Sequence, residues 1–311
     1  MKASYNQGEM TDLKQTSLIR TMRPIHLMTA LAMYLVGAGL ARYLGARMDL
    51  SALGLGLSWL LCLLLGAFLL GDYFKISFET PVLPAKYTVP PSEDQKESPQ
   101  SNLRLFGALA LFSSAGVLTI LMELRGGITP AVGMVLLACF SFTTLVVAPG
   151  LKLKYSGIGE FVISICLVIF PPALSFYMLY GEFHHFLSLG ISPFFPLHLA
   201  LILTLRLRSY PEDCRADRKT LMVRLGWVRG IFLHNLLVLS AFLLFGAAML
   251  FGLPQRIVGP VFLTLLPAGV LIRIYSGLEH GTPVRWPLII FLALVVFFLP
   301  VYLIAFTAWV F

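Results

Sequence analysis

Residues 286–311 read WPLIIFLALVVFFLPVYLIAFTAWVF, a stretch without a charged side chain. An α-helix rises about 1.5 Å per residue, so about 17–25 apolar residues suffice to cross the hydrocarbon core of a bilayer. The stretch is continuously apolar rather than alternating, and lipid offers no partner to exposed backbone N–H and C=O groups, so only a helix satisfies them. It therefore predicts a transmembrane helix.

Eight further apolar runs of similar length occur earlier in the chain. Hydrophobic residues make up 58% of the 311 residues and charged residues only 12%, whereas a soluble domain has about 25% charged residues. We therefore predict an all-α polytopic membrane protein of nine transmembrane helices around a central cavity. Residues 1–24 would form a cytosolic N-terminal segment and residues 25–311 a single transmembrane domain. The earlier runs lie near 25–45, 51–74, 105–123, 128–148, 158–180, 186–205, 229–252 and 255–275.

The basic residues favour one orientation of these helices. If the N-terminus is cytosolic, 19 of the 23 Lys and Arg residues fall in cytosolic segments. Because cytosolic loops carry the excess of Lys and Arg, this predicts a cytosolic N-terminus and a C-terminus outside. The same distribution accounts for most of the net charge of +8, and it indicates no nucleic-acid-binding module. The first apolar run has no small-residue cleavage site and is expected to be retained. The four basic residues outside would be Arg42, Arg47, Arg125 and Arg256.

The four cysteines predict neither a disulfide framework nor a zinc site. Cys62, Cys139 and Cys166 lie in separate apolar runs, and Cys214 lies in a predicted cytosolic loop. No C-x-x-C spacing or Cys/His pairing occurs. We interpret the cysteines as small packing residues.

Two predicted cytosolic loops, 75–104 and 206–228, are richer in polar residues than the others. Just before the first loop, Asp72 lies at the membrane–water boundary, where an unpaired acid is costly. Glu79 follows about two helical turns later, with Lys75 between them. These residues predict either a polar site for an anion and its cation or a salt-bridged cap between Asp72 and Lys75.

The second loop mixes acids and bases in the stretch RSYPEDCRADRKTLMVRL, residues 208–225. Asp213 and Asp217 share one face if the segment is helical, and paired carboxylates near a low-dielectric boundary suit Mg²⁺. Arg218 and Lys219 suit phosphate oxygens. A solvated charged face is the alternative, but mixed charges after two helices on the same side favour a site.

Four stretches resemble the UbiA superfamily of membrane prenyltransferases, and most closely its branch that prenylates 1,4-dihydroxy-2-naphthoate in the menaquinone pathway. The family opens with Arg-Pro before its first helix, and this chain has Arg23-Pro24 there. An Asn-Asp-x-x-Asp-x-x-x-Asp motif follows the family's second helix, where this chain has GDYFKISFE. The other two stretches are APGLKLKYSGIGEF, residues 148–161, and SYPEDCRADRKTLMVRLG, residues 209–226.

The resemblance implies transfer of an isoprenoid chain from its pyrophosphate to an aromatic acceptor in a bacterial or archaeal cell membrane. Mg²⁺ held by carboxylates would neutralise the leaving pyrophosphate, and an electron-rich ring would attack the allylic carbocation. It implies catalytic roles for Asp72, Glu79 and Asp213, which with Asp217 would be the metal ligands. It implies pyrophosphate binding by Arg23, Lys75, Lys152, Arg218 and Lys219, and an acceptor-side role for Tyr155 and Glu160.

Two of these residues also have simpler interpretations. Glu160 could be a first-turn acid that complements a helix dipole, and Lys152 could bind lipid headgroups.

The Asp-rich motifs are degenerate in this chain. In the first, Gly71 stands at the Asn, Lys75 at the middle Asp and Glu79 at the last Asp. In the second, an ungapped alignment puts Ser209 and Asp213 at the two Asp positions, whereas another register pairs Asp213 with Asp217.

The altered motifs leave three possibilities for the charge chemistry. Asp72, Glu79 and Asp213 could still hold one Mg²⁺ ion. Lys75, Arg206 and Arg218 could instead neutralise the pyrophosphate directly. The chain could also have lost the ionisation step and bind isoprenoid or quinone lipids without catalysis. A transporter is a further hypothesis, supported only by the nine spans and the charged residues at their ends.

Overall fold

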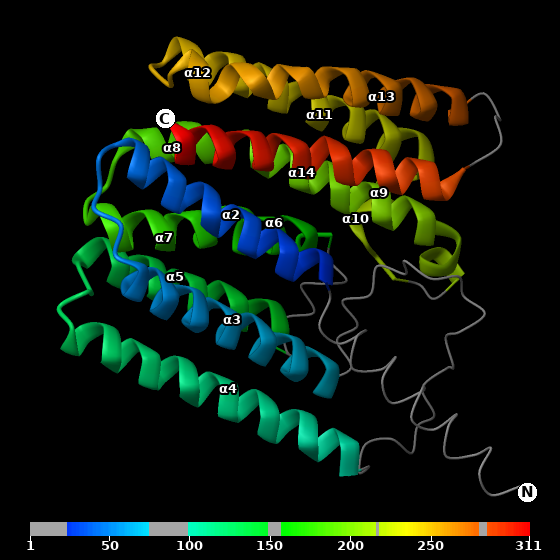
Figure 1. Cartoon of the computed structure of the whole chain (residues 1–311). Helices are drawn as coiled ribbons and strands as arrows, with labels where there is room; N and C mark the ends of the chain where they lie inside the picture. Colours follow the sequence, from blue (N-terminus) through cyan, green and yellow to red (C-terminus); the bar gives the residue numbers. More distant parts are fainter. Residues whose placement is uncertain (1–23, 75–98, 149–156, 216–217, 280–284) are drawn as a thin grey trace, which may run out of the picture.

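A computed structural model of the chain describes residues 24–74, 99–148, 157–215, 218–279 and 285–311 (Figure 1). Every regular element in these ranges is a helix, and nine helical stretches are long and apolar enough to cross a membrane. The chain is therefore an all-α, multi-pass integral membrane protein, as predicted. The spans are α2 (Pro24–Tyr43), α3 (Leu50–Tyr73), α4 (Pro99–Leu124), α5 (Pro130–Val147), α6 (Gly159–Val168) with α7 (Phe170–Tyr180), α8 (His185–Ile191) with α9 (Phe194–Arg215), α11 (Trp227–Leu250), α12 (Gln255–Val258) with the 3-10 helix η4 (Gly259–Thr264) and α13 (Leu265–Glu279), and α14 (Trp286–Val310).

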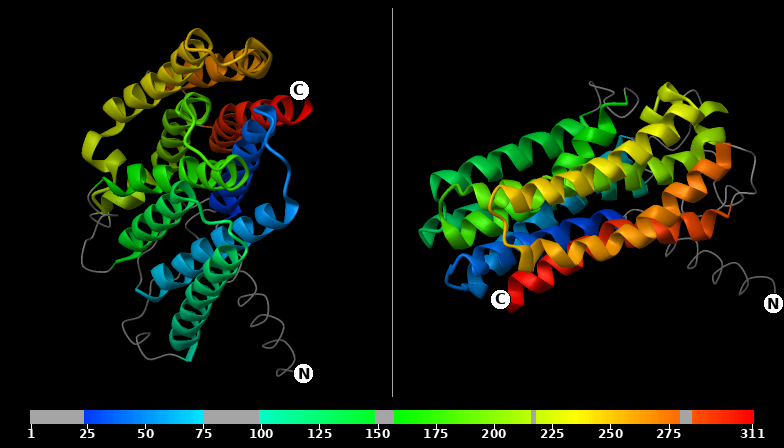
Figure 2. Two further views of the ribbon diagram at one scale, coloured as in Figure 1. Left: turned by 90° about the vertical axis from the view of Figure 1, so that its left-hand side faces the viewer. Right: turned by 90° about the horizontal axis from the view of Figure 1, so that it is seen from above.

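The spans run side by side, so their ends gather at two opposite ends of the bundle (Figures 1 and 2). Helices α2, α4, α6 and α14 begin at one end, where α3, α9 and α13 finish (right in Figure 1). We call this the loop end. The segments rich in Lys and Arg were predicted to lie together on one side of the membrane, since every second connection between spans lies on the same side. The loop end is that side.

Prolines lie where two of the spans are broken. Pro171 and Pro172 lack backbone N–H donors, and the fifth span divides at Ile169 into α6 and α7. The sixth span divides in the same way before Phe194, next to Pro193.

The sixth span extends further than the apolar pattern predicts. The apolar run ends near residue 205, yet α9 stays helical to Arg215, and α10 (Leu221–Leu225) forms a further turn. The prediction that residues 206–228 form a loop was therefore wrong for most of that stretch. The charged residues beyond 205 remain helical because the buried ones among them find partners of opposite charge, described below.

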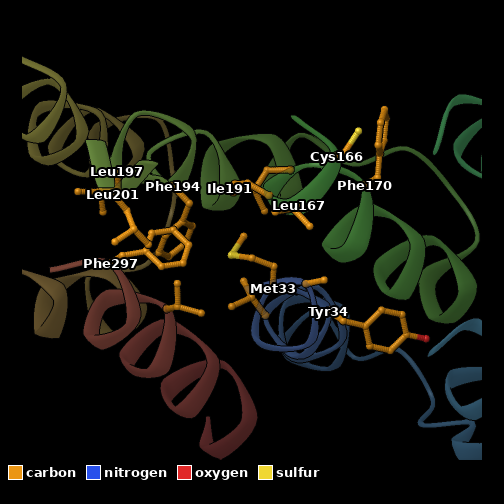
Figure 3. Packing of buried hydrophobic residues seen from close by; sticks show 14 of the residues in the cluster. Met33, Tyr34, Cys166, Leu167, Phe170, Ile191, Phe194, Leu197, Leu201 and Phe297 are labelled. Carbon is orange, nitrogen blue, oxygen red and sulfur yellow. The ribbon is translucent and has the colours of Figure 1, made fainter. Parts of the chain in front are cut away.

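The core lies between the central helices (Figure 3). Met33 of α2 points toward Leu167 and Ile191, and Phe194 and Phe297 belong to the same buried cluster. Backbones approach closely where α2 crosses α7, since a Cβ on Gly37 would collide with the Pro172 carbonyl oxygen. Such close packing by small residues is typical of membrane helices.

Two hollows lie among the residues that the structure describes. A partly open pocket of about 40 Å³ lies between α2, α3, α5 and α6, with His26 and Thr143 among its lining residues. It has room for one or two water molecules but not for an isoprenoid chain. A shallow apolar hollow of about 670 Å³, lined by residues such as Phe242, Gly246 and Phe262, lies toward the other end of α11. The central cavity that the sequence predicts is neither of these two spaces and stays a prediction.

Candidate functional site

Four charged side chains meet at the loop end, where α6, α9 and α10 come together. Arg206 Nε lies 3.7 Å from Glu160 Oε1, and Arg206 Nη1 lies 3.9 Å from Asp213 Oδ2. Arg218 Nη1 donates to Asp213 Oδ1 at 3.3 Å. We call Glu160, Arg206, Asp213 and Arg218 the ion cluster. Positive and negative groups alternate along it, and its formal charge sums to zero.

Three members of the ion cluster are withdrawn from solvent. The exposed fractions are 2% for Glu160, 4% for Arg206 and 1% for Asp213. A buried ion loses its hydration, so it is tolerated only beside an opposite charge. Arg218 differs, because 37% of its side chain is accessible. The ion cluster therefore has a buried interior and one guanidinium at its surface.

Helix geometry explains why Arg206 and Asp213 meet. They are two turns apart on α9 and so share a face of the helix. Ser209 lies between them, and its hydroxyl donates to Asp213 Oδ2 at 3.3 Å and to the Arg206 carbonyl at 3.2 Å. The backbone N–H of Arg218 donates to the Asp213 carbonyl at 2.9 Å, which turns the chain back after α9.

Glu160 links the start of α6 to α10. The backbone N–H of Leu221 donates to Glu160 Oε1 at 3.4 Å. Next to this contact, Gly157 has a φ of +76°, and a Cβ there would lie 3.2 Å from Arg224 Cδ. A glycine is favoured at this position both because it relieves the left-handed backbone and because it leaves room for Arg224. Gly157 and Glu160 thus shape the surface on which α10 rests.

The second carboxylate oxygen of Glu160 has no hydrogen-bond partner among the described residues. A buried acceptor without a partner is costly, so it marks a place for a water molecule or a ligand group. One turn further along α6, Ser164 Oγ donates to the Glu160 carbonyl at 2.9 Å and lies 3.0 Å from His198 Nδ1 on α9. A polar path therefore continues from the ion cluster into the membrane-spanning part of α6 and α9.

The structure brings together some of the predicted site residues. Glu160, predicted on the acceptor side, and Asp213 and Arg218, predicted at the pyrophosphate, all belong to the ion cluster. Asp72 is half-buried in the last turn of α3 at the same loop end, and Lys219 is exposed beside the ion cluster. The predicted residues Arg23, Lys75, Glu79, Lys152, Tyr155 and Asp217 lie outside the described residues.

The described residues do not fit a divalent metal ion. In the ranges that the structure covers, no three His, Cys, Asp or Glu side chains come close enough to hold one. Asp213, the best-buried predicted ligand, faces two guanidinium groups, which would repel Mg²⁺ at its oxygens. The full predicted set also needs Glu79 and Asp217, so a Mg²⁺ site built with them stays a prediction.

The sequence indicates Arg206 only as one of three basic residues that could neutralise the pyrophosphate. Its central position between two carboxylates was not predicted. The available signal was its place directly after the apolar run FFPLHLALILTL, because an ionisable residue in a membrane helix is rare and usually paired or functional. Its partner Glu160 lies on another span, so a single sequence gives no spacing rule that joins them.

No family model matches this chain, and no curated protein is significantly similar to it.

Proposed function

We propose that the chain is an integral-membrane prenyltransferase of the UbiA type, which moves an isoprenoid chain from its pyrophosphate to an aromatic acceptor such as a quinone precursor. One observation carries the proposal. The acceptor-side stretch KYSGIGE and the pyrophosphate-side stretch SYPEDCRADRK are far apart in sequence, yet Glu160 and Asp213 share Arg206 as an ion-pair partner. Two substrates that react with each other need binding groups that are neighbours.

The reaction breaks the bond between the allylic carbon and the pyrophosphate oxygen, and the pyrophosphate leaves with the electron pair. A ring carbon of the acceptor forms the new carbon–carbon bond, and that carbon then loses its proton. In our proposal Arg218 and Lys219, at the surface of the ion cluster, bind the pyrophosphate oxygens. Glu160 orients the acceptor, because its second carboxylate oxygen can accept a hydrogen bond from a ring hydroxyl.

We further propose that the loop end faces the cytosol and that the C-terminus lies outside, in a bacterial or archaeal cell membrane. The support is the distribution of Lys and Arg between alternate connections. A cytosolic loop end would expose Arg218 and Lys219 to water-soluble pyrophosphate headgroups, while the isoprenoid tail stays in the bilayer.

One feature favours a second candidate function, the binding of isoprenoid or quinone lipids without catalysis. Both oxygens of Asp213 are engaged by neighbouring groups, with Arg218 on one and Ser209 and Arg206 on the other. A carboxylate held in this way has a structural role, which is to fix its neighbours, whether or not any chemistry follows.

The test is an assay of prenyl transfer in membranes that contain the chain. Membranes are incubated with labelled isoprenoid pyrophosphates of several lengths and a panel of aromatic acceptors that includes 1,4-dihydroxy-2-naphthoate. We expect a labelled, organic-soluble product that Glu160→Gln lowers by about tenfold or more, as for loss of a substrate-orienting group. Glu212→Gln, a half-buried acid one residue before Asp213 in α9, is the matched control and should keep activity.

If the protein is folded and no acceptor of the panel gives a labelled product, the prenyltransferase proposal is contradicted. Retention of labelled isoprenoid or quinone by the same protein would then favour the lipid-binding function.

A further inference from the structure

We propose that Arg206 takes the place of a metal ion: its guanidinium is a resident cation that holds Glu160 and Asp213 together, so the ion cluster binds no divalent cation. A consequence for the substrate rests on the prenyltransferase function proposed above. If the chain is such an enzyme, guanidinium and ammonium groups bind the pyrophosphate without Mg²⁺.

The first argument is the position of Arg206. Its guanidinium lies between carboxylates from two different spans, 3.7 Å from Glu160 Oε1 and 3.9 Å from Asp213 Oδ2. A divalent ion that joins two carboxylates has the same task, which is to neutralise two negative charges and fix them relative to each other. At 4% exposure, the guanidinium is part of the protein interior and is not a surface group that swings aside.

The second argument is the charge balance. With Arg206 and Arg218 present, the ion cluster is already neutral, so a divalent ion would add two uncompensated positive charges to a buried site. Such a charge is strongly disfavoured where water is excluded. Mg²⁺ also demands near-octahedral oxygen ligands at about 2.0–2.1 Å, and Asp213 meets two nitrogen donors and a hydroxyl instead.

The third argument is that the outer part of the ion cluster can bind an anion unaided. A guanidinium presents five N–H donors in a planar fork, so Arg218 can hold Asp213 and a phosphate oxygen at the same time. Lys219 follows it and is exposed, and Arg224 on α10 is exposed as well. The buried half of the ion cluster thus fixes Asp213, Asp213 fixes Arg218, and Arg218 faces the ligand.

The first experiment measures Mn²⁺, a paramagnetic substitute for Mg²⁺, bound to the purified full-length chain by electron paramagnetic resonance. Arg206→Met should gain one bound Mn²⁺ relative to the wild type, because it leaves two carboxylates without their shared cation. Arg206→Met combined with Asp213→Asn should not gain it, and neither should Arg206→Lys, which keeps the charge. Folding of each variant is checked by its helical circular dichroism and its gel-filtration profile.

Either of two results would overturn the inference about Arg206. One is Mn²⁺ bound to the wild type that Asp213→Asn removes, a comparison that needs no Arg206 variant to fold. The other is a folded Arg206→Met protein that gains no Mn²⁺. Neither result depends on catalysis or on any isoprenoid substrate.

The second experiment measures binding of labelled geranyl pyrophosphate to the wild type, with Mg²⁺ and with excess EDTA. We expect dissociation constants within about twofold of each other, and a weakening of about tenfold in Arg218→Gln, as for loss of one charge-assisted contact. Arg215→Gln, an exposed arginine at the end of α9, is the matched control.

Binding of geranyl pyrophosphate that requires Mg²⁺ would overturn the inference that the site binds pyrophosphate without a metal ion. No binding in either condition would count against the proposed prenyltransferase instead, and the Mn²⁺ measurement would still decide the role of Arg206.

Discussion

Arg206 on α9 and Glu160 on α6 form an ion pair, with 3.7 Å between Nε and Oε1, and this contact ties two spans together at the loop end. Both side chains are buried. A buried pair adds little stability over an apolar pair of the same shape, but breaking it is expensive because one charge is left alone. The pair therefore fixes how α6 and α9 pack against each other, and it adds little to the overall stability of the fold.

The buried ion pair predicts a large loss of stability when only one of its charges is removed. Arg206→Met leaves Glu160 and Asp213 facing each other, and we expect it to lower the free energy of unfolding by about 3–5 kcal/mol. The measurement is thermal or denaturant-induced unfolding in detergent, followed by helical circular dichroism. Arg229→Met, at an exposed arginine in the first turn of α11, is the control and should change stability by at most about 0.5 kcal/mol. A loss of the same size in both variants would contradict a specific role for the pair.

The close crossing of α2 and α7 predicts a second effect, independent of charge. A Cβ on Gly37 would collide with the Pro172 carbonyl and the Ser175 hydroxyl, so Gly37→Ala must push the helices apart. We expect it to destabilise the fold by about 1–3 kcal/mol, as overpacked cores do. Gly116→Ala in α4 is the matched control, because no atom of another described element lies within 4 Å of the added Cβ. That variant should be neutral or slightly stabilising, since alanine is the better helix former. Equal unfolding midpoints for the two variants would show that the crossing is looser than described.

The sequence predicts the fold well because the bilayer constrains it so strongly. A run such as residues 286–311 has no alternative to a helix, and α14 occupies Trp286–Val310 as expected. The break at Ile169 likewise has a local cause in the sequence, because Pro171 and Pro172 lack backbone N–H donors. What the pattern misses is the helical extension from Arg206 to Arg215, where hydropathy indicates a loop.

The candidate site is less predictable because its contacts join distant parts of the chain. The resemblance selects Glu160, Asp213 and Arg218, yet it assigns them to different substrates and to a metal ion. Their shared partner Arg206 is specified only when α6 and α9 pack together. The size of the internal cavity depends on side-chain packing over all nine spans, and no local pattern carries that information.

The cap of α3 predicts a dependence of stability on pH. Asp49 is exposed, and its carboxylate accepts hydrogen bonds from the Ser51 hydroxyl at 2.7 Å, the Ser51 N–H at 2.9 Å and the Ala52 N–H at 3.1 Å. These bonds, with the Ser51 hydroxyl as the largest influence, hold the pKa of Asp49 below the ordinary value of 3.8. Since the folded pKa is the lower one, the charged cap stabilises the fold fully above that ordinary value. The contribution is lost as the pH falls through the folded pKa.

This dependence can be measured against Asp49→Asn, which keeps a side-chain cap but does not ionise. The difference in unfolding temperature between wild type and Asp49→Asn should be constant near neutral pH and should change only below about pH 4. Glu182→Gln, at an exposed acid at the same end of the bundle, serves as the control variant. A difference that is the same at all pH values would rule out the pKa shift as a source of stability.

The exposure of the cysteines allows the proposed orientation to be tested without any added tag. Cys214 near the end of α9 is exposed, whereas Cys139 and Cys166 are buried and Cys62 is partly buried in α3. If the loop end faces the cytosol, a membrane-impermeant maleimide should label Cys214 in inside-out vesicles and not in intact cells. Cys214→Ser should abolish that labelling, because the other three thiols lie within membrane spans. Labelling of Cys214 from outside intact cells would reverse the orientation and place the ion cluster on the outer side. A pyrophosphate made in the cytosol could not reach it there, so this one measurement bears on both the topology and the proposed substrate.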